Sequence, residues 1–243
     1  MNFSAPPVVS TGMLTIMKTK LLTAVSCCFL LSVLVAPVFA DAKERKPRTL
    51  KADGTYETDD GKSGTFTETT TREKGKAERS GSVTNQDGKT ATRKSTTTRD
   101  KATGTGTYTG TTTGPNGKTA TVKATAKKND DGTITTDGTR TGFNGKTSTF
   151  ADTTTKTADG HTTTGTVTGP DGKTATTSSV VSHADGQTTK TQTATGPNGQ
   201  SAERVVTSKA NGDGTATRVI QVTNPDGTTS TRTETVKVEV TKP

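Results

Sequence analysis

The sequence contains few of the residues that form hydrophobic cores. Hydrophobic residues make up 25% of the 243 residues and aromatic residues 3%, and tryptophan is absent. Much of the apolar content lies before residue 41. The remaining chain is too polar to bury a large core or to build a water-excluding catalytic pocket. The composition therefore argues against an enzyme and favours a polar, repetitive protein.

Cysteine is also scarce, and both cysteines lie in one short segment. Cys27 and Cys28 belong to an N-terminal stretch with the features of a secretory signal. Lys18 lies in its basic start, residues 21–35 form an uncharged apolar run, and cleavage is predicted after Ala40. We expect an exported chain, periplasmic or extracellular, without disulfides. A lipid anchor at Cys27 is the alternative to cleavage after Ala40. We expect no membrane-spanning helix after the signal, because no further apolar run is long enough.

Composition divides the chain into three segments. Residues 1–40 comprise an N-terminal extension and the signal peptide, residues 41–50 a charged linker, and residues 51–243 a repeat region rich in threonine and glycine. The formal net charge of the whole chain is +9. A basic chain attracts anionic polymers such as nucleic acid, anionic polysaccharide or lipid headgroups, although the same charge also keeps a polar chain soluble.

Glycine-containing turns recur along the repeat region. Successive turn glycines are 27 to 29 residues apart, which is typical of a repeat protein. A second family of turns lies between them, so each repeat contains two strands. In residues 114–118, proline presets φ and Gly117 accepts the left-handed conformation of a bulged hairpin, with a type I′ turn as the alternative. The glycines of the first family are Gly61, Gly88, Gly117, Gly145, Gly172, Gly199 and Gly227.

Side chains alternate along the predicted strands. Threonine occupies every second position of residues 105–113, and alanine or valine occupies every second position of residues 120–126. Each series therefore lies on one face of its strand. The apolar face is strongest near the C-terminus, as at Val236 and Val238, where we expect the most order.

The Pro-Asp-Gly turn and the threonines of residues 224–229 loosely resemble the tyrosine-aspartate repeats of large bacterial shell and toxin-delivery proteins. The Tyr-Asp pair of those repeats is absent here. The resemblance therefore implies only a meander of hairpins, and no function.

These patterns predict an all-β fold of tandem antiparallel β-hairpin repeats. The repeats of about 28 residues form an extended or curled meander sheet with little hydrophobic core. The alternative is a largely disordered, low-complexity chain, because low hydrophobicity with net charge is typical of disorder. A membrane barrel is disfavoured, since no strand carries an outward apolar band flanked by aromatic girdles.

The sequence offers little that carries chemistry. His161 and His183 lie beside Asp-Gly turns and could approach each other across neighbouring hairpins. Residues 129–132 and 211–214 supply oxygen ligands of the kind that calcium prefers, but neither continues into an EF-hand loop. We expect ordinary turns at these places, with no catalytic residue, no metal site and no cofactor.

Three functions are compatible with an exported repeat protein. The first is a structural or interaction protein of the cell envelope or extracellular matrix, which self-associates through sheet edges or contacts envelope polymers. The second is a cationic module for anionic polymers such as polysaccharide, lipopolysaccharide or nucleic acid. The third is recognition of ice or carbohydrate by threonine arrays. The second rests on lysines that follow successive turn glycines and would line one edge: Lys62, Lys89, Lys118, Lys146 and Lys173.

Overall fold

The computed structural model describes residues 47–241, which form fourteen β-strands joined by short turns. The sequence-based prediction of an all-β hairpin protein is confirmed, and the disordered alternative is wrong for this part of the chain. The strands are β1 (Arg48–Thr58), β2 (Ser63–Glu73), β3 (Lys76–Asn85), β4 (Thr90–Asp100), β5 (Thr105–Thr113), β6 (Thr119–Lys128), β7 (Ile134–Thr141), β8 (Thr147–Lys156), β9 (Gly160–Thr168), β10 (Thr174–Ala184), β11 (Gln187–Thr195), β12 (Ser201–Ala210), β13 (Thr215–Thr223) and β14 (Thr229–Thr241).

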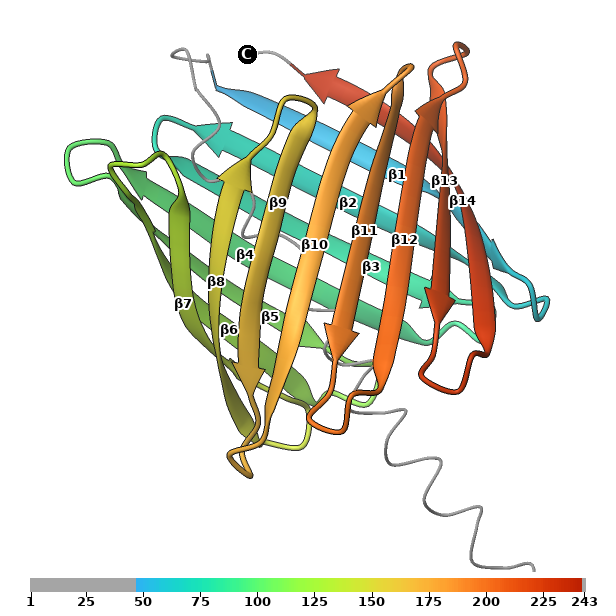
Figure 1. Ribbon diagram of the computed structural model, residues 1–243. Coiled ribbons are helices and arrows are strands. Elements are labelled where there is room, and N and C mark those ends of the chain that lie inside the picture. Colours follow the sequence, from blue (N-terminus) through green and yellow to red (C-terminus); the bar gives the residue numbers. More distant parts are fainter. Residues whose placement is uncertain (1–46, 242–243) are drawn as a thin grey trace, which may run out of the picture. The chain divides into compact units, whose positions relative to one another are not determined.

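Each strand pairs antiparallel with the next, and the sheet closes into a barrel when β14 pairs with β1 (Figure 1). The closing ladder runs from the Thr49–Thr241 pair to the Thr58–Arg232 pair. An extended meander, which the sequence left open, is therefore wrong. An even number of strands lets the first and last strands meet antiparallel, and closure leaves no strand edge unpaired. The predicted self-association through sheet edges loses its structural basis for the same reason.

The turns explain why the strands pair in sequence order. In the β5–β6 turn, the amide of Gly117 donates to the carbonyl of Gly114 at 2.9 Å, and the amide of Gly114 donates to the carbonyl of Lys118 at 2.8 Å. Gly117 has φ +77°, whereas Asn116 is not among the residues with positive φ. This is the bulged hairpin expected from the sequence rather than a type I′ turn. A type I′ pair does occur at Asp185 (φ 52°) and Gly186 (φ 72°), between β10 and β11.

The two faces of the sheet differ in burial. Along β6, Ala120, Val122, Ala124 and Ala126 are between 1% and 7% exposed, while alternate residues such as Lys123 face solvent. The apolar series predicted from the sequence is therefore the protected face, and in a closed barrel the protected face is the interior. Threonine dominates the outer face, where neighbouring strands exchange hydroxyl contacts.

Aromatic rings on the inner face cover glycines. Gly54 is paired directly with Phe66, and Gly64 with Tyr56. A Cβ atom at Gly54 would lie 2.9 Å from Cζ of Phe66, and one at Gly64 would lie 2.6 Å from the hydroxyl of Tyr56. Glycine lets the wall bend without a side-chain clash, and the ring covers the backbone that glycine leaves open.

Two predictions concern the N-terminal part of the chain. Strand β1 begins at Arg48, inside the segment 41–50 that was expected to be a linker. The predicted signal peptide, the cleavage after Ala40 and both cysteines lie outside the described residues.

Within residues 47–241, the structure has no helix that is long and apolar enough to cross a membrane.

Candidate functional site

The interior of the barrel carries nearly all of the guanidinium groups. Residues that are directly paired on neighbouring strands lie on the same face of the sheet. Arg140, for example, pairs with the buried Val122 and therefore lies on the inner face. All arginines after residue 47 lie on the inner face by this criterion. They are Arg48, Arg72, Arg79, Arg93, Arg99, Arg140, Arg204, Arg218 and Arg232.

The inner face has a large excess of positive charge. Lys128, Lys156 and Lys190 share it with the nine arginines, whereas its acids are Glu68, Asp152 and Glu234. Twelve cations and three carboxylates leave an excess of nine positive charges on the inner face of residues 47–241. The other lysines of residues 47–241 lie on the outer face or in turns. Arginine holds its charge at any physiological pH, so the interior is permanently basic.

On the β2–β5 side of the barrel, arginines are paired with an acid and a phenol. Arg79 forms an ion pair with Glu68, and Nη2 of Arg93 donates to the hydroxyl of Tyr108 at 2.9 Å. Tyr108 is 6% exposed. These contacts fix the side chains against the wall.

The β7–β10 wall holds one acid among apolar and hydroxyl groups. Arg140 is 9% exposed, and its Cζ lies 5.9 Å from the centroid of Phe150. Burial raises the pKa of Asp152 to about 6, although the charge of Arg140 and a hydrogen bond from Thr177 oppose this shift. The side chain of Asp152 passes over Gly165 to reach Thr177. A Cβ atom at Gly165 would collide with Oδ1 of Asp152.

The β11–β14 wall carries one inward cation on each of its four strands: Lys190, Arg204, Arg218 and Arg232. Glu234, which is 5% exposed, accepts from Nη1 of Arg218 at 3.1 Å and contacts Nη2 of Arg232 at 2.8 Å. Arg204 donates from Nη1 to Oε1 of Gln192 at 3.1 Å. Burial lowers the pKa of Lys190 to about 8, and the nearby charge of Arg204 adds to the effect.

The lysines singled out from the sequence lie elsewhere. Lys62, Lys89, Lys118, Lys146 and Lys173 occupy turns that all join an odd-numbered strand to the next even-numbered one. These turns therefore lie at one end of the barrel, the lower end in Figure 1. The lysines were expected to line the straight edge of an open sheet, and in the closed barrel they follow its curved rim instead. Lys62 pairs with Asp60, and Lys173 lies 3.9 Å from Asp171. The structure brings none of these lysines to the inner wall.

The histidines and the acidic turns are placed as follows. His161 and His183 lie on the inner face of neighbouring strands, where burial, Lys190 and then His183 lower the pKa of His161. In the β6–β7 turn, Oδ1 of Asp131 accepts from the amide and hydroxyl of Thr133, at 2.9 and 2.7 Å. Its oxygen thus serves the turn. Among residues 47–241, no group of three or more acids, histidines or cysteines is arranged to hold a metal ion.

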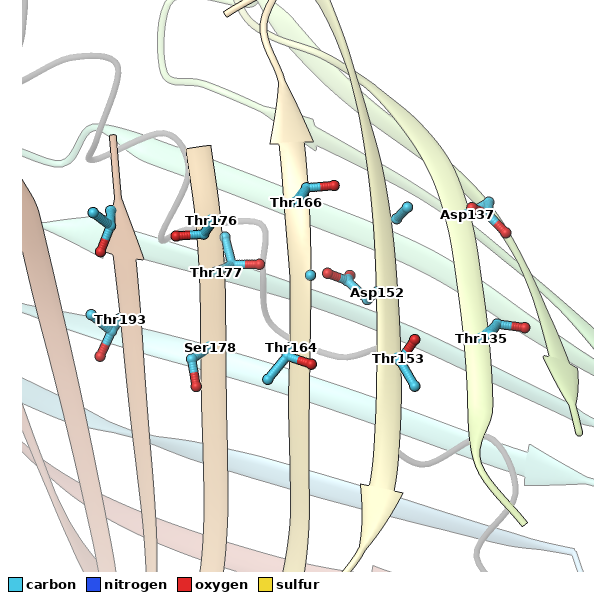
Figure 2. A pocket seen from close by; sticks show the side chains of 13 residues that line it. Thr135, Asp137, Asp152, Thr153, Thr164, Thr166, Thr176, Thr177, Ser178 and Thr193 are labelled. Atoms are coloured by element: carbon cyan, nitrogen blue, oxygen red, sulfur yellow. The ribbon is translucent and has the colours of Figure 1, made fainter. Parts of the chain in front are cut away.

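The outer face carries a shallow hollow of about 590 Å³ that crosses β7 to β11. Figure 2 shows its lining, in which hydroxyl side chains such as Thr164, Thr166 and Thr176 follow one another over neighbouring strands. Its lining includes Asp137 from the outer face and, from inward positions of the wall at Gly165, also Asp152. The hollow lies in the threonine-rich outer face, and no positively charged side chain of the described residues lines it.

Sequence reasoning missed the arginines of the inner wall. The signal was present in the alternation of side chains, because Ala91, Arg93 and Arg99 share one parity of β4 while four of its five threonines occupy the other. The net charge alone carries no information on the positions of the arginines. Their spacing along the chain varies, whereas the lysines recur at the same position after the turn glycines.

The fold and inner wall define a closed antiparallel β-barrel with a basic interior. No family model matches the sequence, and no curated protein matches it. Among solved structures, a mutant of Rh. blastica porin is similar in fold, with a TM-score of 0.52 and 8% sequence identity. The match covers 80% of this chain and 99% of the porin chain. At this identity the likeness concerns the fold alone.

Proposed function

We propose that the chain is an exported β-barrel of the cell envelope whose interior binds anionic groups. The observation that supports this proposal is the separation of charge between the faces, with all arginines of residues 47–241 on the inner wall. The porin-like barrel and the predicted signal peptide are compatible with an envelope location. The proposal keeps the cationic binding module foreseen from the sequence and moves its binding surface from the lysines to the arginines.

An elongated scaffold fits less well, because β1 and β14 close the sheet and leave no edge at which repeats could continue. The role proposed here needs no catalytic residue and no cofactor. It relies on guanidinium groups, which bind carboxylate, sulfate and phosphate oxygens through paired N–H donors.

The experiment compares how easily arginines and lysines are modified chemically. The exported protein is treated with phenylglyoxal, which modifies arginine, and the sites are mapped by mass spectrometry with sodium phosphate or sodium chloride at equal ionic strength. We expect phosphate to slow modification of the inner arginines at least fivefold. A parallel acetylation of lysine should leave outward residues such as Lys94 and Lys209 unaffected by phosphate. Equal modification rates in phosphate and chloride would contradict anion binding.

A second candidate function is a membrane pore, and the barrel closure shared with a porin favours it. The outer face opposes it, because threonine hydroxyls and lysines take the place of an apolar band. The two candidates differ in a planar bilayer, where a pore would give stepwise, anion-selective conductance. The protein we propose would stay soluble after extraction of envelopes with carbonate and would give no steps.

A further inference from the structure

The inner wall of β11 to β14 gathers four cations on neighbouring strands. Gln192 pairs with Arg204 across β11 and β12, and Arg218 pairs with Glu234 across β13 and β14. Lys190 lies two residues before Gln192 on the same face, and Arg232 two residues before Glu234. We call Lys190, Arg204, Arg218 and Arg232 the β11–β14 cation cluster.

The cluster is not neutralised by the protein groups that contact it. Glu234 is the only carboxylate in contact with it among the described residues, and it is shared between Arg218 and Arg232. Arg204 has a neutral partner, Oε1 of Gln192. Four cations and one carboxylate leave an excess of three positive charges, all of them on side chains that are at least partly buried.

Uncompensated charges of the same sign are costly where water is limited. Lys190 relieves part of this cost by its lowered pKa, but the three guanidinium groups cannot lose their protons. Arg232 is held in place by Tyr56, whose ring centroid lies 3.7 Å from the Cζ of Arg232. Its Nε is buried and has no hydrogen-bond partner within residues 47–241. The positive charge of the cluster therefore exceeds the negative charge of the one described carboxylate that contacts it.

We propose that the β11–β14 cation cluster is a binding site for a doubly charged oxyanion, a phosphate or sulfate group, on the inner wall of the barrel. This inference rests on the proposed function and names the place and chemistry of its ligand. A guanidinium group presents two parallel N–H donors that match two oxygens of such a group. The excess of three positive charges favours a divalent anion over a carboxylate or chloride. Glu234 orients Arg218 and Arg232 and leaves Arg204 as the arginine with no acidic contact.

Isothermal titration of the full chain with sodium phosphate and, separately, with sodium sulfate tests the site, with sodium chloride at matched ionic strength as the reference. We expect Arg204→Gln and Arg218→Gln each to weaken phosphate binding at least tenfold. Lys209→Gln and Lys237→Gln are matched controls, because they remove outward charges from β12 and β14 and should change affinity less than twofold. Circular dichroism verifies that each variant is folded, and Arg204→Lys, which keeps the charge, should retain part of the affinity.

The sulfate titration shows whether the site distinguishes phosphate from sulfate. Equal affinities would indicate a general oxyanion site, and a preference for phosphate would indicate recognition of its additional proton. If the wild-type chain binds phosphate but Arg204→Gln and Arg218→Gln do not weaken it, whereas Arg93→Gln does, the cluster is not the site and the proposed function stands. If the wild-type chain binds neither phosphate nor sulfate, both proposals are wrong.

Discussion

Phe150 lies over Gly138, its direct partner across the β7–β8 pair. A Cβ atom at Gly138 would come within 2.7 Å of Cε1 of Phe150 and within 2.5 Å of the carbonyl oxygen of Lys123. Phe150 is 8% exposed and contributes to the small apolar part of the inner wall. Gly138 therefore allows the backbone to bend, and the ring of Phe150 covers the backbone at that position.

Substitution of either partner should destabilise the barrel. We expect Gly138→Ala to lower the free energy of unfolding by about 1–3 kcal/mol, because the new methyl group meets backbone that cannot move freely. Phe150→Ala should cost about 3–5 kcal/mol through loss of buried ring surface. Gly196→Ala is the control, since its Cβ would meet only the carbonyl oxygen of Gln200, at 3.6 Å. Urea denaturation measures all three, and equal stability of Gly138→Ala and Gly196→Ala would disprove the steric argument.

Closure makes the number of strands a property of the whole barrel. Deletion of Gly117–Asn144 removes β6 and β7 and joins two similar turns in register. In an open meander this loss would cost little, whereas in a barrel it changes the strand number that tilt and shear must match. We expect a large fall in the midpoint of thermal unfolding, or loss of β structure, by circular dichroism. Two glycines inserted after the exposed Gly199 are the control and should be tolerated. A deletion variant as stable as the parent would argue against closure.

Asp152 gives the barrel a dependence on pH. Burial raises the pKa of this carboxyl from 3.8 to about 6, so the folded chain binds the proton more tightly than the unfolded chain does. The resulting stability is fully present below pH 4 and is lost as pH rises through 6. This rise in pKa corresponds to at most about 3 kcal/mol. Partial exposure of the side chain reduces the expected effect to about 1–2 kcal/mol.

Asp152→Asn should remove this dependence. Relative to wild type, the variant should gain about 1–2 kcal/mol in unfolding free energy between pH 4 and pH 7.5. Urea denaturation at both values measures the change, and the exposed Asp171→Asn serves as the control. A stability difference between wild type and Asp152→Asn that is the same at both pH values would show that the carboxyl titrates normally.

The ring of lysines at the lower end of the barrel remains a separate prediction. Replacing Lys62, Lys89, Lys118, Lys146 and Lys173 together by glutamine should lower the salt concentration that elutes the protein from immobilised heparin, because exposed charges act through screened, long-range attraction. The same variant should bind phosphate with unchanged affinity, since none of the five lysines lies on the inner wall. Unchanged elution from heparin would exclude the ring as a polyanion surface.

The sequence by itself determined the local structure. Turn glycines such as Gly117 set the hairpins, and the alternation of threonine with alanine or valine separated the two faces of each strand. These features depend on residues that are close together in the chain, so their physical chemistry can be recognised in short windows. The position of the lysines directly after the turn glycines could also be recognised from the sequence, whereas their role in binding polyanions stays a prediction.

Closure, and with it the identity of the inner face, was decided only by the tertiary structure. The pairing of β1 with β14 joins Thr58 to Arg232, and no local pattern reports whether the accumulated twist of fourteen strands will bring these ends together. An open sheet would leave the arginines on one solvated surface. The closed barrel confines them to a shared interior, where charges such as those of Arg204 and Arg218 act on one another through limited water.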